Sequence, residues 1–65
     1  MDPDACRQRI LDAQADCDDE EALYASSDLL WCLRNGGAAP TGMTREEALT
    51  WAKRVNNDAK GGLRR

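Results

Sequence analysis

The stretch NGGAAPTGMTREE, residues 35–47, decides the fold because it ends one helix and begins the next. Asn35 followed by two glycines is typical of a helix C-terminus, where the chain turns through a left-handed conformation. Three glycines and a proline between residues 36 and 43 predict a loop. Thr44 and Glu47 then form a capping box, in which each side chain accepts a hydrogen bond from the other residue's backbone N–H. We therefore expect one helix to end near residue 35 and another to begin at residue 44.

Similar boundary signals lie upstream of this stretch. Asp18 or Asp19 is suited to cap the helix that runs to residue 35. The acidic residues after the cap interact favourably with the positive N-terminal end of the helix dipole. Asp2 and Pro3 mark the start of an earlier helix, since proline is preorganised for the first helical position. No strand-like alternation is present. The sequence predicts an all-α fold, either a small three-helix bundle or a helical hairpin plus a third helix, with helices at about 3–17, 19–35 and 44–60.

The chain is short of large apolar side chains. It has 65 residues, of which 42% are hydrophobic, but ten of these are alanine, three are cysteine and none is phenylalanine. This length allows one domain, which we expect over residues 1–60, with 61–65 as a flexible basic tail after Gly61 and Gly62. Below roughly 70–80 residues a core rarely supplies more than a few kcal/mol without a disulfide, a metal or another chain. We therefore expect a protein partner or a second copy.

The first and third helices offer only narrow apolar faces. The first has one large residue, Ile10, in a stripe of small ones, and the third has a ridge of small residues flanked by Leu49 and Trp51. The stripe consists of Cys6, Ile10, Ala13 and Cys17, and the ridge consists of Ala48, Ala52, Val55 and Ala59.

The second helix is apolar on more than one side. A leucine seam occupies one face, and Tyr24 and Trp31 form a stripe turned by about 100° from it. One interpretation places this helix at the centre, between the other two. The other directs Tyr24 and Trp31 into a partner, since these residue types dominate binding hot spots. Both interpretations are open at this point.

The residues needed for common chemistry are missing or poorly placed. The chain has no histidine and no CxxC pair, which argues against a zinc site and against a histidine base. A calcium loop begun at Asp16 fails, because Glu21 stands where glycine is required and Ser27 stands where glutamate is required. We expect Cys32 to be the exposed thiol. Its acidic neighbours raise the pKa of a thiol, which makes it a poor nucleophile. A chain this short is also expected to lack a pocket of a few hundred Å³. We expect no enzymatic activity, no metal and no cofactor.

The sequence predicts a cytoplasmic protein without a membrane association. The longest apolar run covers five residues, 29–33, whereas a membrane-spanning helix needs about 20. The N-terminus reads MDPD, which is acidic where a secretory signal would be basic.

Charge is divided unevenly along the chain. Residues 1–30 hold nine acids and two bases, a net charge of −7, and residues 31–65 hold seven bases and three acids, a net charge of +4. The acidic half could dock on a basic surface of another protein. The basic half, which includes Arg45 and Arg54, could contact phosphates. The halves could equally neutralise one another within the fold or between two copies.

These observations favour a small acidic protein that acts by occupying a surface of a larger protein. Inhibitors and adaptors work in this way, and a phage- or mobile-element-type inhibitor of a nucleic-acid-handling machine fits by analogy with that class. The alternatives are a self-assembling homo-oligomer and, with less support, a nucleic-acid-binding regulator. The residues expected to contact the partner are Tyr24, Leu29, Leu30, Trp31 and Leu33, together with the acidic residues Asp16, Asp18, Asp19, Glu20 and Glu21.

Overall fold

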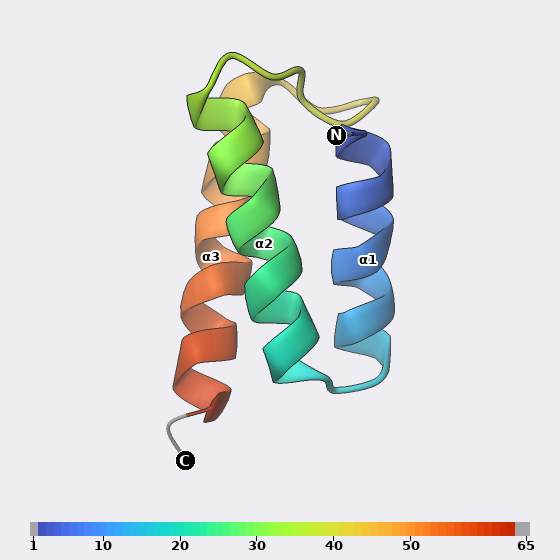
Figure 1. The fold of residues 1–65 in the computed structure, drawn as a ribbon, viewed down its shortest axis with the longest axis vertical. Helices are drawn as coiled ribbons and strands as arrows, with labels where there is room; N and C mark the ends of the chain where they lie inside the picture. Colours follow the sequence, from blue (N-terminus) through green and yellow to red (C-terminus); the bar gives the residue numbers. More distant parts are fainter. Residues whose placement is uncertain (1, 64–65) are drawn as a thin grey trace.

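The computed structural model describes residues 2–63, which form the helices α1 (Pro3–Ala15), α2 (Asp19–Arg34) and α3 (Arg45–Leu63). The part of the chain that the structure describes contains no strand. Consecutive helices run in opposite directions along a molecule of about 33 × 17 × 17 Å (Figure 1). The predicted all-α, three-helix fold is confirmed, and the helix ends lie within three residues of the predicted ones.

Side-chain caps fix where each helix begins. A carboxylate oxygen of Asp2 accepts a hydrogen bond from the backbone N–H two residues later at 3.0 Å, and Asp18 accepts from the N–H three residues later at 3.1 Å. Thr44 and Glu47 form the predicted capping box: the Thr44 N–H donates to the Glu47 carboxylate at 3.0 Å, and the Glu47 N–H donates to the Thr44 hydroxyl at 3.1 Å. These bonds satisfy N–H groups that have no partner inside the helix.

The C-terminal end of α2 is closed by its own turn and by α3. Gly36 has a φ of 85°, as the left-handed stop requires, and the Gly37 N–H donates to the Cys32 carbonyl at 2.7 Å. Arg45, in the first turn of α3, donates from one guanidinium nitrogen to the Gly37 carbonyl at 2.6 Å and from another to the Leu33 carbonyl. The end of α2 and the start of α3 are therefore bonded to each other.

The first helix ends two residues before the predicted boundary. Cys6, Ile10 and Ala13 are buried, but Cys17 is exposed and has a φ of 54°. The prediction that Cys17 continues the apolar stripe was wrong, because the chain has already left the helix at Ala15 and turns toward α2.

The third helix runs past the predicted boundary. Gly61, Gly62 and Leu63 belong to α3, so the helix continues three residues past its predicted end near residue 60 and includes the first part of the segment predicted as a tail. The extension lies beside α2. A Cβ atom added to Gly62 would lie 2.0 Å from a carboxylate oxygen of Asp19, which shows how closely the last turn of α3 approaches the start of α2. Residues 64 and 65 of the predicted tail lie outside the described residues.

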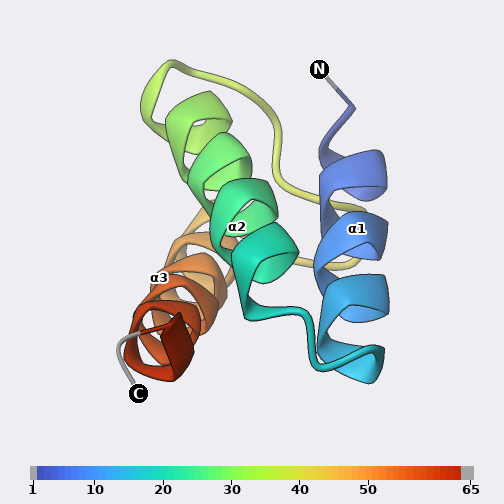
Figure 2. The same cartoon turned by 60° about the horizontal axis from the view of Figure 1, so that its bottom comes forward.

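The helix α2 is the central element of the fold. It packs against both α1 and α3, whereas α1 and α3 make few contacts with each other (Figure 2). Its leucines supply most of the large buried side chains, and Leu29 and Leu33 are fully buried. The predicted small-residue ridge of α3, formed by Ala48, Ala52, Val55 and Ala59, is buried against this core. The interpretation that places α2 between the other two helices is confirmed.

A buried polar cluster joins α2 to α3. The side-chain amide of Asn56 is 7% exposed and donates to the hydroxyls of Ser26 at 3.1 Å and Ser27 at 2.9 Å. Ser26 is fully buried and donates in turn to the Leu23 carbonyl at 3.1 Å. Because an unpaired polar group at this depth is unfavourable, the cluster favours the one register in which Asn56 faces the two serines.

The loop between α2 and α3 is held against α1. Pro40 is buried, and Thr41 donates to the Asp4 carboxylate from its N–H at 2.7 Å and from its hydroxyl at 2.8 Å. These bonds join the start of α1 to a residue 37 positions later in the chain. The loop thereby covers one end of the space between α1 and α3.

Candidate functional site

Tyr24 and Trp31 project from the outer face of α2. Their side chains are 55% and 65% exposed, which is high for large aromatic residues. They are seven residues apart, so they lie on the same side of the helix, about 10 Å apart along its axis. The structure therefore leaves two amphipathic aromatic side chains available on one surface.

Trp31 stands between two shallow hollows. One, of about 240 Å³, lies on the side of the N-terminus of α1, and the other, of about 320 Å³, lies on the side of α3. The first is lined by Pro3, Trp31, Cys32, Asn35, Gly37 and Ala38, and the second by Ser27, Leu30, Trp31, Arg34, Asn56 and Lys60. A partner that covers Trp31 could thus reach into both hollows.

The leucines that were predicted to contact a partner are core residues. Leu29 and Leu33 are fully buried and Leu30 is 8% exposed. They pack on the small side chains of the neighbouring helices, so no partner can reach Leu29 or Leu33 in this fold. Of the apolar residues of α2 predicted to contact a partner, only Tyr24 and Trp31 are therefore available. The leucines are used in the core and cannot also form an exposed face.

The five predicted acidic residues gather at the turn between α1 and α2. Asp16, Asp19 and Glu20 are exposed, and Asp18 is the N-terminal cap of α2. Glu21 is bonded within the fold, because Arg9 donates to its carboxylate at 2.8 Å and to Asp28 at 3.0 Å. These acids lie at one end of the molecule, about 16 Å along α2 from Trp31. They are Asp16, Asp18, Asp19, Glu20 and Glu21. The predicted site is thus a strip along α2 and not a compact patch.

Two of the three thiols differ from their predicted exposure. Cys17 is exposed, Cys32 is partly exposed and Cys6 is buried. The expectation that Cys32 is the exposed thiol and Cys17 a small core residue was wrong, because α1 ends before Cys17. Burial raises the pKa of the Cys6 thiol, so less of it is present as the reactive thiolate.

The basic half offers fewer free cations than its sequence suggests. Arg45 is engaged with the carbonyl groups at the end of α2. Arg64 and Arg65 lie outside the described residues. The candidate phosphate contacts that remain on α3 are Lys53, Arg54 and Lys60, all exposed.

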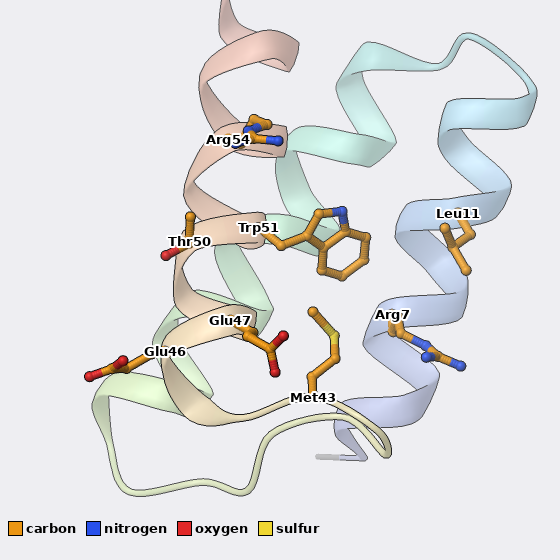
Figure 3. Close-up of a pocket in the computed structure, with 8 residues that line it drawn as sticks. All are labelled: Arg7, Leu11, Met43, Glu46, Glu47, Thr50, Trp51 and Arg54. Carbon is orange, nitrogen blue, oxygen red and sulfur yellow. The ribbon is translucent and has the colours of Figure 1, made fainter.

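A groove between α1 and α3 was not predicted from the sequence. Its volume is about 680 Å³ and it is open to solvent on the side away from α2 (Figure 3). Leu11, which is 42% exposed, Met43 and the half-buried Trp51 give it apolar walls. The remaining lining residues are Arg7, Glu46, Glu47, Thr50 and Arg54. The expectation that so short a chain has no space of several hundred Å³ was wrong, because α1 and α3 are held apart by α2.

One sequence signal pointed to this groove. Leu11 is a large apolar residue one position after Ile10, so it lies about 100° away from the buried stripe of its own helix. Trp51 likewise lies beside the small-residue ridge of α3 rather than on it. Two such residues on neighbouring helices mark an apolar surface outside the core, but only the fold places them on opposite walls of one groove.

Residues 2–63 contain neither a cluster of three metal-ligating side chains nor a helix long and apolar enough to cross a membrane. Comparison with protein families, curated proteins and solved structures found no match to this chain.

Proposed function

We propose that this protein is a non-enzymatic binding module that acts by occupying a surface of a larger protein through the outer face of α2. The observation that carries the proposal is the exposure of Tyr24 and Trp31, at 55% and 65%, on a chain with few large apolar residues. Tyrosine and tryptophan bury a large area for a small loss of side-chain entropy and are enriched among binding hot spots.

The acidic end of α2 supports a partner with a basic surface. Asp16, Asp19 and Glu20 are exposed there, so their charges act directly on an approaching molecule. Asp18 and Glu21 are hydrogen-bonded within the fold and contribute charge rather than new contacts. Complementary charge raises the association rate and orients the partner, and this effect weakens as salt screens it.

A cytoplasmic inhibitor or adaptor is the class of protein that this surface suits. Basic surfaces are common on proteins that handle nucleic acid, and an acidic helix can cover such a surface without any chemistry of its own. A phage- or mobile-element-type inhibitor of such a protein remains part of the proposal by analogy with that class. Nucleic acid itself is a less suitable partner, given the net charge of −3 and the use of Arg45 within the fold.

Affinity capture with matched variants tests the proposal. The tagged parent chain, the double variant Tyr24→Ala/Trp31→Ala and the control Gln14→Ala/Asn57→Ala are immobilised and exposed to an extract of the cells that encode the chain. The control removes two exposed polar side chains from other helices. Far-ultraviolet circular dichroism first establishes that all three chains are equally helical.

The expected result is a protein retained by the parent and by the control but lost from the double variant. Because each hot-spot residue contributes about 2 kcal/mol, the double variant should bind the purified partner about a thousandfold more weakly. Retention of the same proteins by all three chains would show that the outer face of α2 is not the binding surface. An association rate that does not fall with salt would remove the role of the acidic end.

A further inference from the structure

The groove between α1 and α3 has an apolar centre with opposite charges on either side. On α3, its wall is formed by Glu47, Thr50, Trp51 and Arg54, which follow the spacing of one helix face. Leu11 lies on α1 at about the height of Trp51, as Figure 3 shows. The acidic side chain is therefore N-terminal to the apolar centre of α3, and the basic side chain is C-terminal to it.

This order of charges allows two copies of α3 to attract each other. An identical α3 laid antiparallel across the first, with the centre of rotation between Thr50 and Trp51, brings each Glu47 opposite the Arg54 of the other copy. Both pairs are then attractive, and the apolar centres of the two copies meet. A parallel arrangement would instead place like charges opposite one another.

The local charge of the groove also suits a second copy. Each chain carries a net charge of −3, so two copies repel over most of their surfaces. The groove is lined by two arginines and two glutamates and is neutral as a whole. The ion pairs within residues 2–63 involve Arg9, so neither Arg54 nor Glu47 is ion-paired there. One Glu47 carboxylate oxygen accepts the capping bond from the Thr44 N–H, and the carboxylate keeps its charge for a partner.

We propose that a second copy of this chain docks on the groove between α1 and α3, forming an antiparallel two-fold dimer centred on Trp51 and Leu11. The molecule extends over 33 × 17 Å on its long side, which limits the area that a second copy can cover to on the order of 600 Å² per partner, toward the small end of specific interfaces. We expect a weak dimer from so small an area, with a dissociation constant on the order of micromolar. It uses a different face from Tyr24 and Trp31, so it stands independently of the proposed partner-binding function.

Sedimentation equilibrium of the full chain measures this association. Between about 10 µM and about 1 mM, the apparent mass should rise from the monomer value toward twice that value. The monomer mass is 7.2 kDa. The variants Arg54→Glu and Leu11→Gln change exposed side chains and should each weaken the dimer, the first by roughly tenfold because two attractive pairs become repulsive. Lys53→Glu is the matched control: it makes the same charge change at the neighbouring exposed position and should leave the dissociation constant within about twofold.

A charge exchange tests the two-fold arrangement itself. Arg54→Glu and Glu47→Arg each place like charges opposite one another in their own dimers, but a mixture of the two variants restores both attractive pairs. The mixture should therefore associate as tightly as the parent while each variant alone does not. Because Glu47 is part of the capping box, circular dichroism must show that its variant remains helical, and Arg54→Glu and Leu11→Gln test the surface without touching that cap.

Three results would overturn the proposal. The parent chain could remain monomeric across the whole concentration range. It could dimerise with an affinity that Arg54→Glu and Leu11→Gln leave unchanged. It could also lose its dimer in Tyr24→Ala/Trp31→Ala and keep it in the groove variants, which would place the interface on the outer face of α2.

Discussion

Replacing Asn56 by alanine should destabilise the fold more than any other single polar substitution in the described helices. The Asn56 amide donates to Ser26 and Ser27 at 3.1 and 2.9 Å from a site that is 7% exposed. Each neutral hydrogen bond contributes about 0.5–1.5 kcal/mol net, and removing the amide group also leaves unfilled space between α2 and α3. We expect a loss of about 2–3 kcal/mol in the free energy of unfolding.

This loss is large for a chain of this length. Small domains are stable by roughly 0.05–0.15 kcal/mol per residue, which gives on the order of 3–10 kcal/mol here. Urea unfolding followed by helical circular dichroism measures the change, since m values of small proteins are near 1 kcal/mol/M. The urea midpoint of Asn56→Ala should accordingly fall by about 2–3 M.

Asn57→Ala is the matched control for this prediction. Asn57 is exposed on the same turn of α3, so its substitution makes the same change in helix propensity without touching the buried cluster. Its midpoint should stay equal to the parent's or rise slightly. In a double-mutant cycle, Asn56→Ala and Ser26→Ala should be non-additive by at least about 0.5 kcal/mol. Equal midpoints for Asn56→Ala and Asn57→Ala, or an additive cycle, would refute the argument that the cluster stabilises the α2–α3 interface.

Two further predictions concern the end of α3 and the start of α1. Gly61→Ala should raise the unfolding free energy by about 0.5–1 kcal/mol, because alanine favours the helix and nothing lies within 4 Å of the added methyl group. In Gly62→Ala the methyl group meets the Asp19 carboxylate, so this gain should be absent or reversed; thermal melts of both variants compare them directly. Hydrogen bonds from Thr41 hold the pKa of Asp4 below its ordinary value of 3.8, so their stabilisation is present above that value and lost as pH falls through the pKa of the folded state. Urea midpoints measured from pH 6 to pH 2 should fall less steeply in Asp4→Asn than in the parent, and identical slopes would contradict this linkage.

Features that depend on neighbours in the sequence were predictable. The capping groups Asp2, Asp18, Thr44 and Glu47 act within three residues of their own positions, so their spacing alone identifies the helix starts. The order of the three helices followed from these boundaries. The concentration of leucine in one helix left two interpretations of α2 open, and its packing against both α1 and α3 decided between them.

Features that depend on tertiary packing were not predictable in the same way. Asn56 lies at helical spacing from Ala52 and Ala59, so its place beside the buried ridge could be read from the sequence. Its partners are about 30 residues away, and nothing in the local sequence identifies the two serines that it meets. Glycine propensity predicted an end to α3 near residue 60, but the helix continues to Leu63, where Gly62 lies close to the start of α2. The candidate surface changed for a similar reason: the three leucines predicted for a partner were needed for the core.

The central position of α2 means that the protein does not have the same local stability along its length. Because α1 packs against one helix only, it can separate from the fold while the α2–α3 hairpin keeps its own interface, its buried amide and the bonds from Arg45. Amide hydrogens of α1 would then exchange through partial opening, whereas those in the centre of α2 require global unfolding. A released α1 also exposes Ile10 and one face of α2, which gives the chain a route to exchange this helix with another copy.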